Sequence, residues 1–213
     1  MYTRPVCFDL DGVIINSEPT HMESFKRTLT SRDIALTDEG YVAYFAGKTD
    51  EQGFTDFLTA KNVSLHELPQ LLNDKTRTYL QLATSIDCYS DAITLMQDLV
   101  DHNTALALVT GSNNAEATAA LAATSLSNVF STIVCAEDIT HGKPHPEGYL
   151  LAAERLGVAP HDCIAIEDSP SGCRAAKAAG MTCIAITNTH SATELTDADY
   201  ITDQLNARLL ADL

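Results

Sequence analysis

The chain has 213 residues, of which 45% are hydrophobic, so one large or two small domains with a sizeable core fit its length. Its 29 Asp and Glu residues outnumber 13 Lys and Arg residues, and the resulting net charge of −16 disfavours nucleic acid or an anionic membrane as a partner. The first residues lack a signal-peptide pattern, no apolar run approaches the roughly 18 residues of a membrane span, and the cysteines form no CxxC pair. We therefore expect a cytoplasmic protein with reduced thiols.

The first predicted element is a short apolar strand at residues 5–8, which leads into Asp9, Asp11 and Gly12. Residues i and i+2 of a strand point to the same side, so Asp9 and Asp11 can address one site at the strand's carboxyl end. Two carboxylates held close resist joint ionisation. This pattern suits one carboxylate as a nucleophile and the other as a general acid/base, with Mg²⁺ screening their charge.

The next segment, from about residue 18 to 85, has a helical pattern throughout. Met22, Phe25 and Leu29 recur at helical spacing. Two capping-box patterns follow, one from Thr49 to Gln52 and one from Ser64 to Glu67. Since no strand-like run interrupts this segment, we expect it to be a helical insertion after the first strand.

From about residue 88 the pattern alternates between strands and helices. Strands are predicted at 105–109, 132–135, 163–166, 182–186 and 199–201, and helices at 91–101, 114–124, 146–156 and 171–179. Strands that alternate with helices of this length predict a parallel sheet with right-handed crossovers. The sequence therefore predicts an α/β fold whose sheet includes the strand before Asp9.

Polar side chains gather at the carboxyl ends of these predicted strands. Thr110 and Gly111 end the second strand, Lys143 precedes a later helix, and Glu167 and Asp168 end the strand at 163–166. In a parallel sheet these ends share one edge, where open α/β sheets bind ligands. Mg²⁺ prefers oxygen ligands and works with substrate phosphates, and a lysine and a threonine hydroxyl suit the remaining phosphoryl oxygens. The pattern indicates a Mg²⁺-dependent phosphoryl-transfer site.

Four motifs in this order resemble those of the haloacid dehalogenase superfamily, in the subgroup with a helical cap that includes β-phosphoglucomutase and small phosphatases. The motifs are DLDGV at 9–13, VTGS at 109–112, GKPHP at 142–146 and IEDSPSG at 166–172. The resemblance covers essentially the whole chain. It implies a Rossmann-like core at residues 1–16 and 88–213, and a cap domain at 17–87 with hinges near 15–17 and 86–89.

The resemblance also implies roles for individual residues. Asp9 would form an aspartyl-phosphate, and Asp11 would protonate the leaving oxygen and then activate water. Thr110, Gly111 and Lys143 would hold the phosphoryl group. The metal ligands would be Asp9, the backbone carbonyl of Asp11 and Asp168, with Glu167 in or near that set.

Substrate contacts are expected from His21 and Lys48 of the cap, and from Ser112 and Asn114 of the core. The mutase pattern has an arginine where this chain has Asp50. We therefore predict a phosphatase for a small phosphorylated metabolite, with a sugar phosphate as the expected substrate. A phosphosugar mutase of the β-phosphoglucomutase type is the alternative, and a catalytically silent binding module is a third reading. A monomer or weak homo-oligomer is expected.

Overall fold

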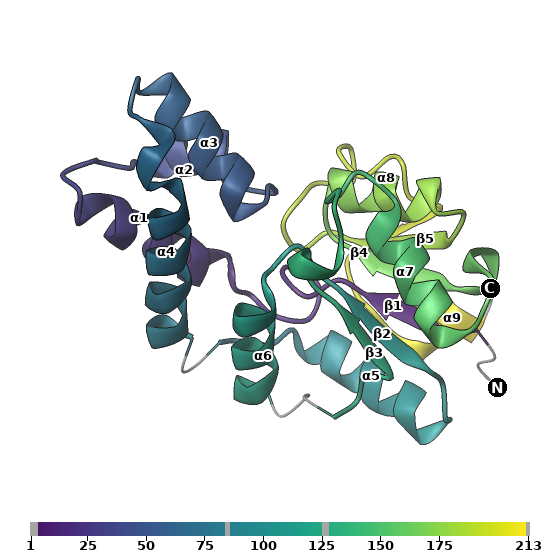
Figure 1. Cartoon of the computed structure of the whole chain (residues 1–213). Coiled ribbons are helices and arrows are strands. Elements are labelled where there is room, and N and C mark those ends of the chain that lie inside the picture. The colour runs from purple at the N-terminus through teal and green to yellow at the C-terminus, as the bar shows by residue number, and fades with distance from the viewer. Residues whose placement is uncertain (1–3, 84–85, 125–127, 212–213) are drawn as a thin grey trace.

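Six parallel strands form the central sheet of the computed structural model, which describes residues 4–83, 86–124 and 128–211. The strand order is β3-β2-β1-β4-β5-β6 (Figure 1). The strands are β1 (Val6–Phe8), β2 (Leu106–Val109), β3 (Thr132–Val134), β4 (Ile164–Glu167), β5 (Thr182–Ile186) and β6 (Tyr200–Thr202). The predicted α/β fold with a parallel sheet is confirmed, and each predicted strand lies within one residue of an observed one.

Strand β1 lies inside the sheet and positions the first acidic motif. Val6 pairs in parallel register with Leu106 of β2 on one side and with Ile164 of β4 on the other. Strands β2 and β3 lie on one side of β1, and the later strands β4, β5 and β6 lie on the other side. The carboxyl end of β1 is therefore a topological switch point. The residues that follow β1, β2 and β4 therefore meet at one edge.

Two hydrophobic clusters cover opposite faces of the sheet. Val6 and Phe8 belong to one cluster, whereas Cys7 belongs to the other together with Tyr149 and Cys173. This division follows from the two-residue period of a strand, and burial on both faces explains why β1 is continuously apolar. The helices of this part are α5 (Ser90–Asp101), α6 (Asn114–Ala123), α7 (Glu147–Leu156), α8 (Pro170–Ala178) and α9 (Ala207–Ala211), with 3₁₀ turns η2 (Ala136–Asp138) and η3 (Pro160–Asp162).

The inserted helices lie to one side of the sheet and have a core of their own (Figure 1). They are α1 (Glu18–Thr30), α2 (Asp38–Tyr44), α3 (Asp50–Ala60) and α4 (Leu68–Leu82). Their cluster is aromatic: Phe25 lies 4.3 Å from Phe45 and 5.0 Å from Phe54, measured between ring centroids. A separate core is consistent with the expected cap domain, which stays a proposal.

The two chain segments that join the inserted helices to the sheet run side by side. Asn16 N donates to Asp87 O at 2.8 Å, and Tyr89 N donates to Ile14 O at 2.9 Å. Both segments coincide with the expected hinges, so a rotation here would carry α1–α4 together. Residues 84 and 85, near the predicted boundary, lie outside the described residues.

The two capping-box patterns have different outcomes. Thr49 caps α3 as predicted, because its side chain accepts a hydrogen bond from Gln52 N. Ser64 instead accepts from His66 N and begins a 3₁₀ turn, η1 (Leu65–Glu67). Helix α4 starts only at Leu68, and Pro69 lies in its first turn. Proline is tolerated there because the N–H groups of the first turn have no acceptor within the helix. Within the described ranges, no helix is both long and apolar enough to span a membrane.

Candidate active site

Asp9 follows β1 at the carboxyl edge of the sheet and contacts a partly buried lysine. Lys143 Nζ donates to Asp9 Oδ1 at 2.7 Å and to the carbonyl oxygen of Val109 at 3.1 Å. The same ammonium lies 2.6 Å from Glu167 Oε1. Burial raises the pKa of Asp9 well above its usual value; Lys143 opposes this, and Glu167 adds to it. The sheet edge thus holds a desolvated carboxylate whose charged form is supported by one cation.

Two glycines create the space for the neighbouring acids. Gly12 has φ +81°, and a Cβ there would lie 2.0 Å from Asp168 Oδ2. A Cβ on Gly172 would lie 2.0 Å from the Glu167 carboxylate. The glycines of the DLDGV and PSG segments are therefore needed for close approach of side chains, and Gly12 also for its left-handed backbone.

Glu167 is fully buried, and hydrogen bonds hold both of its oxygens. Tyr149 Oη donates to Oε1 at 2.6 Å, while Asp168 N and Ser169 Oγ donate to Oε2 at 3.2 and 3.3 Å. Asp168 itself accepts a hydrogen bond from Thr189 Oγ1. Burial, followed by the charge of Glu167, raises the pKa of Asp168 to about 7 although Thr189 lowers it.

These acids form a group that fits a metal ion. Asp9, Glu167 and Asp168 offer oxygen atoms that all lie within 4.8 Å of one another. Burial raises the pKa values of Asp9 and Asp168, and the charges of the neighbouring acids add to this effect while Lys143 opposes it. A hard divalent cation with oxygen ligands would supply the missing positive charge. The residues therefore fit the ion that the sequence predicts.

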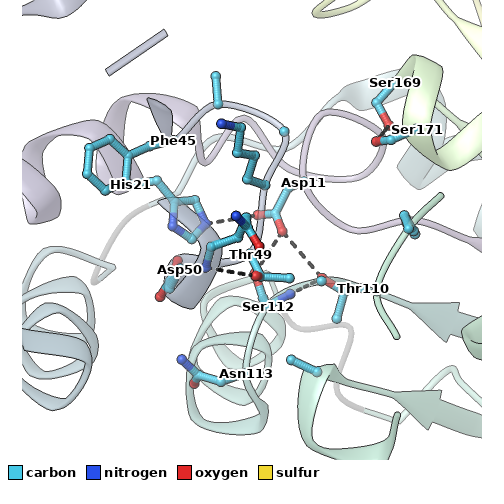
Figure 2. Close-up of a pocket in the computed structure, with 18 of the residues that line it drawn as sticks. Asp11, His21, Phe45, Thr49, Asp50, Thr110, Ser112, Asn113, Ser169 and Ser171 are labelled. Carbon is cyan, nitrogen blue, oxygen red and sulfur yellow. Dashed lines mark hydrogen bonds and ion pairs between the residues drawn. The ribbon is translucent and has the colours of Figure 1, made fainter. Parts of the chain in front are cut away.

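The carboxylate of Asp11 lies among hydroxyl and imidazole groups (Figure 2). Ser112 Oγ donates to Asp11 Oδ2 at 2.9 Å, Ser17 Oγ donates to Oδ1, and His21 Nε2 lies 3.4 Å from Oδ1. Burial alone would raise the pKa of Asp11, but these hydrogen bonds outweigh it and hold the pKa well below its usual range. Asp11 is consequently a carboxylate in this arrangement.

The residues after β2 form a tight turn beside Asp11. Thr110 Oγ1 accepts a hydrogen bond from Ser112 N at 3.0 Å and lies 3.4 Å from Asp11 Oδ2. Gly111 is exposed, and a Cβ there would meet nothing. Thr110, Gly111 and Ser112 line one cavity of about 1340 Å³ together with Asp9, Asp11 and Lys143. The structure thus brings the predicted phosphate-binding residues to the predicted acids.

The expected substrate residues differ in where they lie. His21 and Lys48 line the cavity, as do Ser112 and Asp50. Asn114 is not among the lining residues; its backbone N donates to the Glu137 carboxylate. Its neighbour Asn113 lines the cavity instead and also caps α6, accepting a hydrogen bond from Glu116 N.

The charged cap residues are neutralised by partners of their own. Lys48 Nζ lies 2.9 Å from Asp56 Oδ2, and Gln52 donates to the other oxygen of that carboxylate at 2.6 Å. Asp50 Oδ2 lies 2.8 Å from Lys75 Nζ. The cap thus presents Lys48 and Asp50 to the cavity as members of ion pairs.

Lys75 connects the cap to the core and was missed by sequence reasoning. It is fully buried, and its ammonium contacts His21 Nδ1 at 3.0 Å and both Glu116 oxygens at 3.0 and 3.1 Å, besides Asp50. An ammonium can only donate, so His21 Nδ1 accepts and Nε2 carries the proton that faces Asp11. The available signal was a lysine at helical spacing between Leu71 and Tyr79, on the buried face of α4.

The fold and the site together define an α/β protein with a cluster of carboxylates at the carboxyl edge of its parallel sheet. The family model of haloacid dehalogenase-like hydrolases matches residues 6–186. The chain belongs to this family. The predicted recognition and the predicted enzyme class, a hydrolase of phosphoric monoesters, are thereby confirmed.

Similar proteins include both kinds of enzyme that the sequence suggested. The chain is 30% identical over 203 residues to a validoxylamine A 7'-phosphate phosphatase from Streptomyces hygroscopicus subsp. limoneus, covering 93% of this chain and 92% of the relative. It is also 30% identical over 190 residues to a β-phosphoglucomutase from Bacillus subtilis, covering 86% and 83%. The crystal structure of CbbY from Rhodobacter sphaeroides in complex with phosphate has the same fold, with a TM-score of 0.91, 24% identity and 99% coverage of each chain.

Proposed function

We propose that the chain is a Mg²⁺-dependent phosphatase that hydrolyses the monophosphate of a small carbohydrate through an aspartyl-phosphate. The observation that carries this proposal is the pair of carboxylates after β1: Asp9 faces Lys143, and Asp11 faces hydroxyl and imidazole donors. Phosphatase activity is supported by the name of the first relative, and a sugar substrate by the name of the second.

In the first step Asp9 attacks phosphorus, and the bond between phosphorus and the leaving oxygen breaks. The ion pair with Lys143 opposes the effect of burial on the pKa of Asp9, and Lys143 is placed to donate to a phosphoryl oxygen, as is the hydroxyl of Thr110. The bound Mg²⁺ would neutralise charge on the transferring group. Asp9, the backbone carbonyl of Asp11 and Asp168 would hold it.

Glu167 has a different role in this proposal. Its oxygens already accept hydrogen bonds from Tyr149, Asp168 N and Ser169, and they pair with Lys143. It is also not among the residues that line the cavity. We therefore propose that Glu167 orients Lys143 and the metal ligands, and does not bind the ion directly.

Asp11 serves both steps by changing its protonation state. The hydrogen bonds from Ser17, His21 and Ser112 favour the carboxylate, which is the form that accepts a proton from the attacking water in the second step. In the first step Asp11 must donate a proton to the leaving oxygen. A bound phosphate dianion nearby disfavours the ionised form of Asp11 and raises its pKa, so that Asp11 can carry the proton that it donates.

The similarity to a β-phosphoglucomutase favours mutase activity as the second candidate. Such a reaction needs a grip on the second phosphate of a sugar bisphosphate. In this cap Lys48 is paired with Asp56, and Asp50 occupies the position of the mutase arginine. Lys48 is thus already engaged by a carboxylate, and Asp50 has no positive charge to offer a second phosphate, so these pairs support a phosphatase.

The test is a screen of phosphorylated sugars and polyols for phosphate release in excess Mg²⁺. The wild type should release phosphate from at least one monophosphate, while Asp9→Asn should lose at least about 10³-fold in kcat and keep its circular dichroism spectrum. Glucose 6-phosphate formation from β-glucose 1-phosphate is measured alongside, with a bisphosphate primer. If primed isomerisation exceeds phosphate release, the mutase assignment replaces this one.

Helices α1–α4 would act as a cap that closes over the site, excludes water and selects the substrate. The domain division at 1–16 and 88–213 against 17–87 belongs to this proposal. A cytoplasmic location, a monomer or weak homo-oligomer, and no nucleic-acid or membrane partner stay predictions.

A further inference from the structure

The loop that carries Lys143 presents two histidines on its outer side. Lys143 turns inward to Asp9, whereas the side chains of His141 and His145 are 64% and 51% exposed. His145 also lines the cavity, and the His141 ring lies beside the His145 ring. The proposed phosphatase mechanism uses neither of them.

A carboxylate completes a group of three ligand atoms. Glu147 Oε2 lies 3.0 Å from His141 Nδ1 and 3.8 Å from His145 Nδ1, and the three ligand atoms all lie within 4.8 Å of one another. Two ligand atoms each about 2.1 Å from one tetrahedral zinc ion are roughly 3.4 Å apart. The two distances to Glu147 bracket this spacing, so small side-chain rotations would bring all three atoms onto one ion.

The backbone fixes this group in place. Thr140 N donates to Glu147 Oε1 at 2.7 Å, and His141 N donates to Oε2 at 3.0 Å. His145 N donates to Gly142 O at 3.0 Å and closes a turn between the two histidines. The centroids of the two imidazole rings lie 4.7 Å apart. Because the carboxylate is oriented by backbone donors, metal binding would need little ordering of the loop.

We propose that His141, His145 and Glu147 form a second metal site, for a transition-metal ion of the Zn²⁺ type. Two imidazoles and one carboxylate suit zinc, whereas Mg²⁺ prefers sites made of oxygen ligands such as the acidic group at the sheet edge. The exposed imidazoles leave the remaining coordination positions open to water. This site is independent of the proposed phosphatase function, since it uses none of the residues assigned to phosphoryl transfer.

The test is calorimetric titration of Zn²⁺ into the full chain in excess Mg²⁺, which occupies the acidic group. The variants are His141→Ala and His145→Ala. The matched control is His161→Ala, because His161 is also exposed and lies 3.7 Å from a single carboxylate, that of Asp162. Circular dichroism before titration shows that each variant is folded.

The wild type should bind one Zn²⁺ per chain. Both variants should weaken this binding by at least about 10-fold, because even losing a hydrogen-bond partner of a ligand costs about 10- to 100-fold, and His161→Ala should leave it unchanged. Glu147→Gln retains an oxygen that can accept the hydrogen bond from Thr140 N. It should also weaken Zn²⁺ binding, because the side chain loses its negative charge. Absence of Zn²⁺ binding in excess Mg²⁺ overturns the proposal. Unchanged affinity in both histidine variants places the ion elsewhere and overturns it as well.

Discussion

Replacing Lys75 by methionine should strongly destabilise the protein. Methionine retains most of the hydrocarbon stem but removes the ammonium that contacts His21, Asp50 and Glu116. The side chain of Glu116 is 1% exposed, so its carboxylate would lose its cation without gaining water. Removing one partner of a buried ion pair costs about 3–5 kcal/mol. Since whole domains are stable by only about 5–15 kcal/mol, this loss is a large fraction of the total.

Urea unfolding followed by circular dichroism and by tyrosine fluorescence measures the free energy of unfolding. The matched control is Lys26→Met, because Lys26 also belongs to the inserted helices but pairs with Asp38, whose side chain is 72% exposed. This control should change the free energy of unfolding by less than about 1 kcal/mol. The double variant Lys75→Met/Glu116→Gln should recover part of the loss, because the stranded carboxylate is neutralised.

A loss below about 1 kcal/mol in Lys75→Met, equal to that of Lys26→Met, would refute the reasoning. It would mean that the buried network around Lys75 does not hold the inserted helices against α6. Additivity of the two substitutions in the double variant would contradict the direct pairing of Lys75 with Glu116, since contacting residues couple by about 0.5–3 kcal/mol.

Three further outcomes are expected. Asp11→Asn should slow phosphorylation by sugar phosphates by about 10²- to 10⁴-fold and by an activated aryl phosphate much less; equal losses in pre-steady-state assays would argue against proton donation to the leaving oxygen. Removing metal with a chelator should abolish turnover, because Asp9, Glu167 and Asp168 face only Lys143 as a counter-charge among the described residues; activity of metal-stripped enzyme would contradict the metal site. Gly172→Ala should lower the free energy of unfolding by about 1–3 kcal/mol, since its Cβ would lie 2.0 Å from the Glu167 carboxylate; an unchanged urea midpoint would show that Glu167 moves freely.

The sequence alone determined the elements of the sheet and the position of the acidic site. Short strand-like runs located all six observed strands to within one residue, and three of these runs lead into a polar motif. Strand formation depends on local composition and on a two-residue period. The sequence also predicted that Asp9, Thr110 and Asp168 lie close together, because parallel strands place their carboxyl ends at one edge of the sheet. No tertiary contact was needed for these inferences.

Only the tertiary structure decided which charges neutralise one another. Lys75 lies 54 residues from His21 and 41 from Glu116 in the chain, and no local pattern records either contact. Asp50 reads from the sequence as a carboxylate facing the substrate, but in the folded chain it is paired with Lys75. The proposed second metal site of His141, His145 and Glu147 likewise depends on a turn that brings three side chains together. The ion pairs of Lys75 are fixed by the packing of α1, α3, α4 and α6 around its desolvated ammonium. Only the assembled fold can offset the cost of burying that charge.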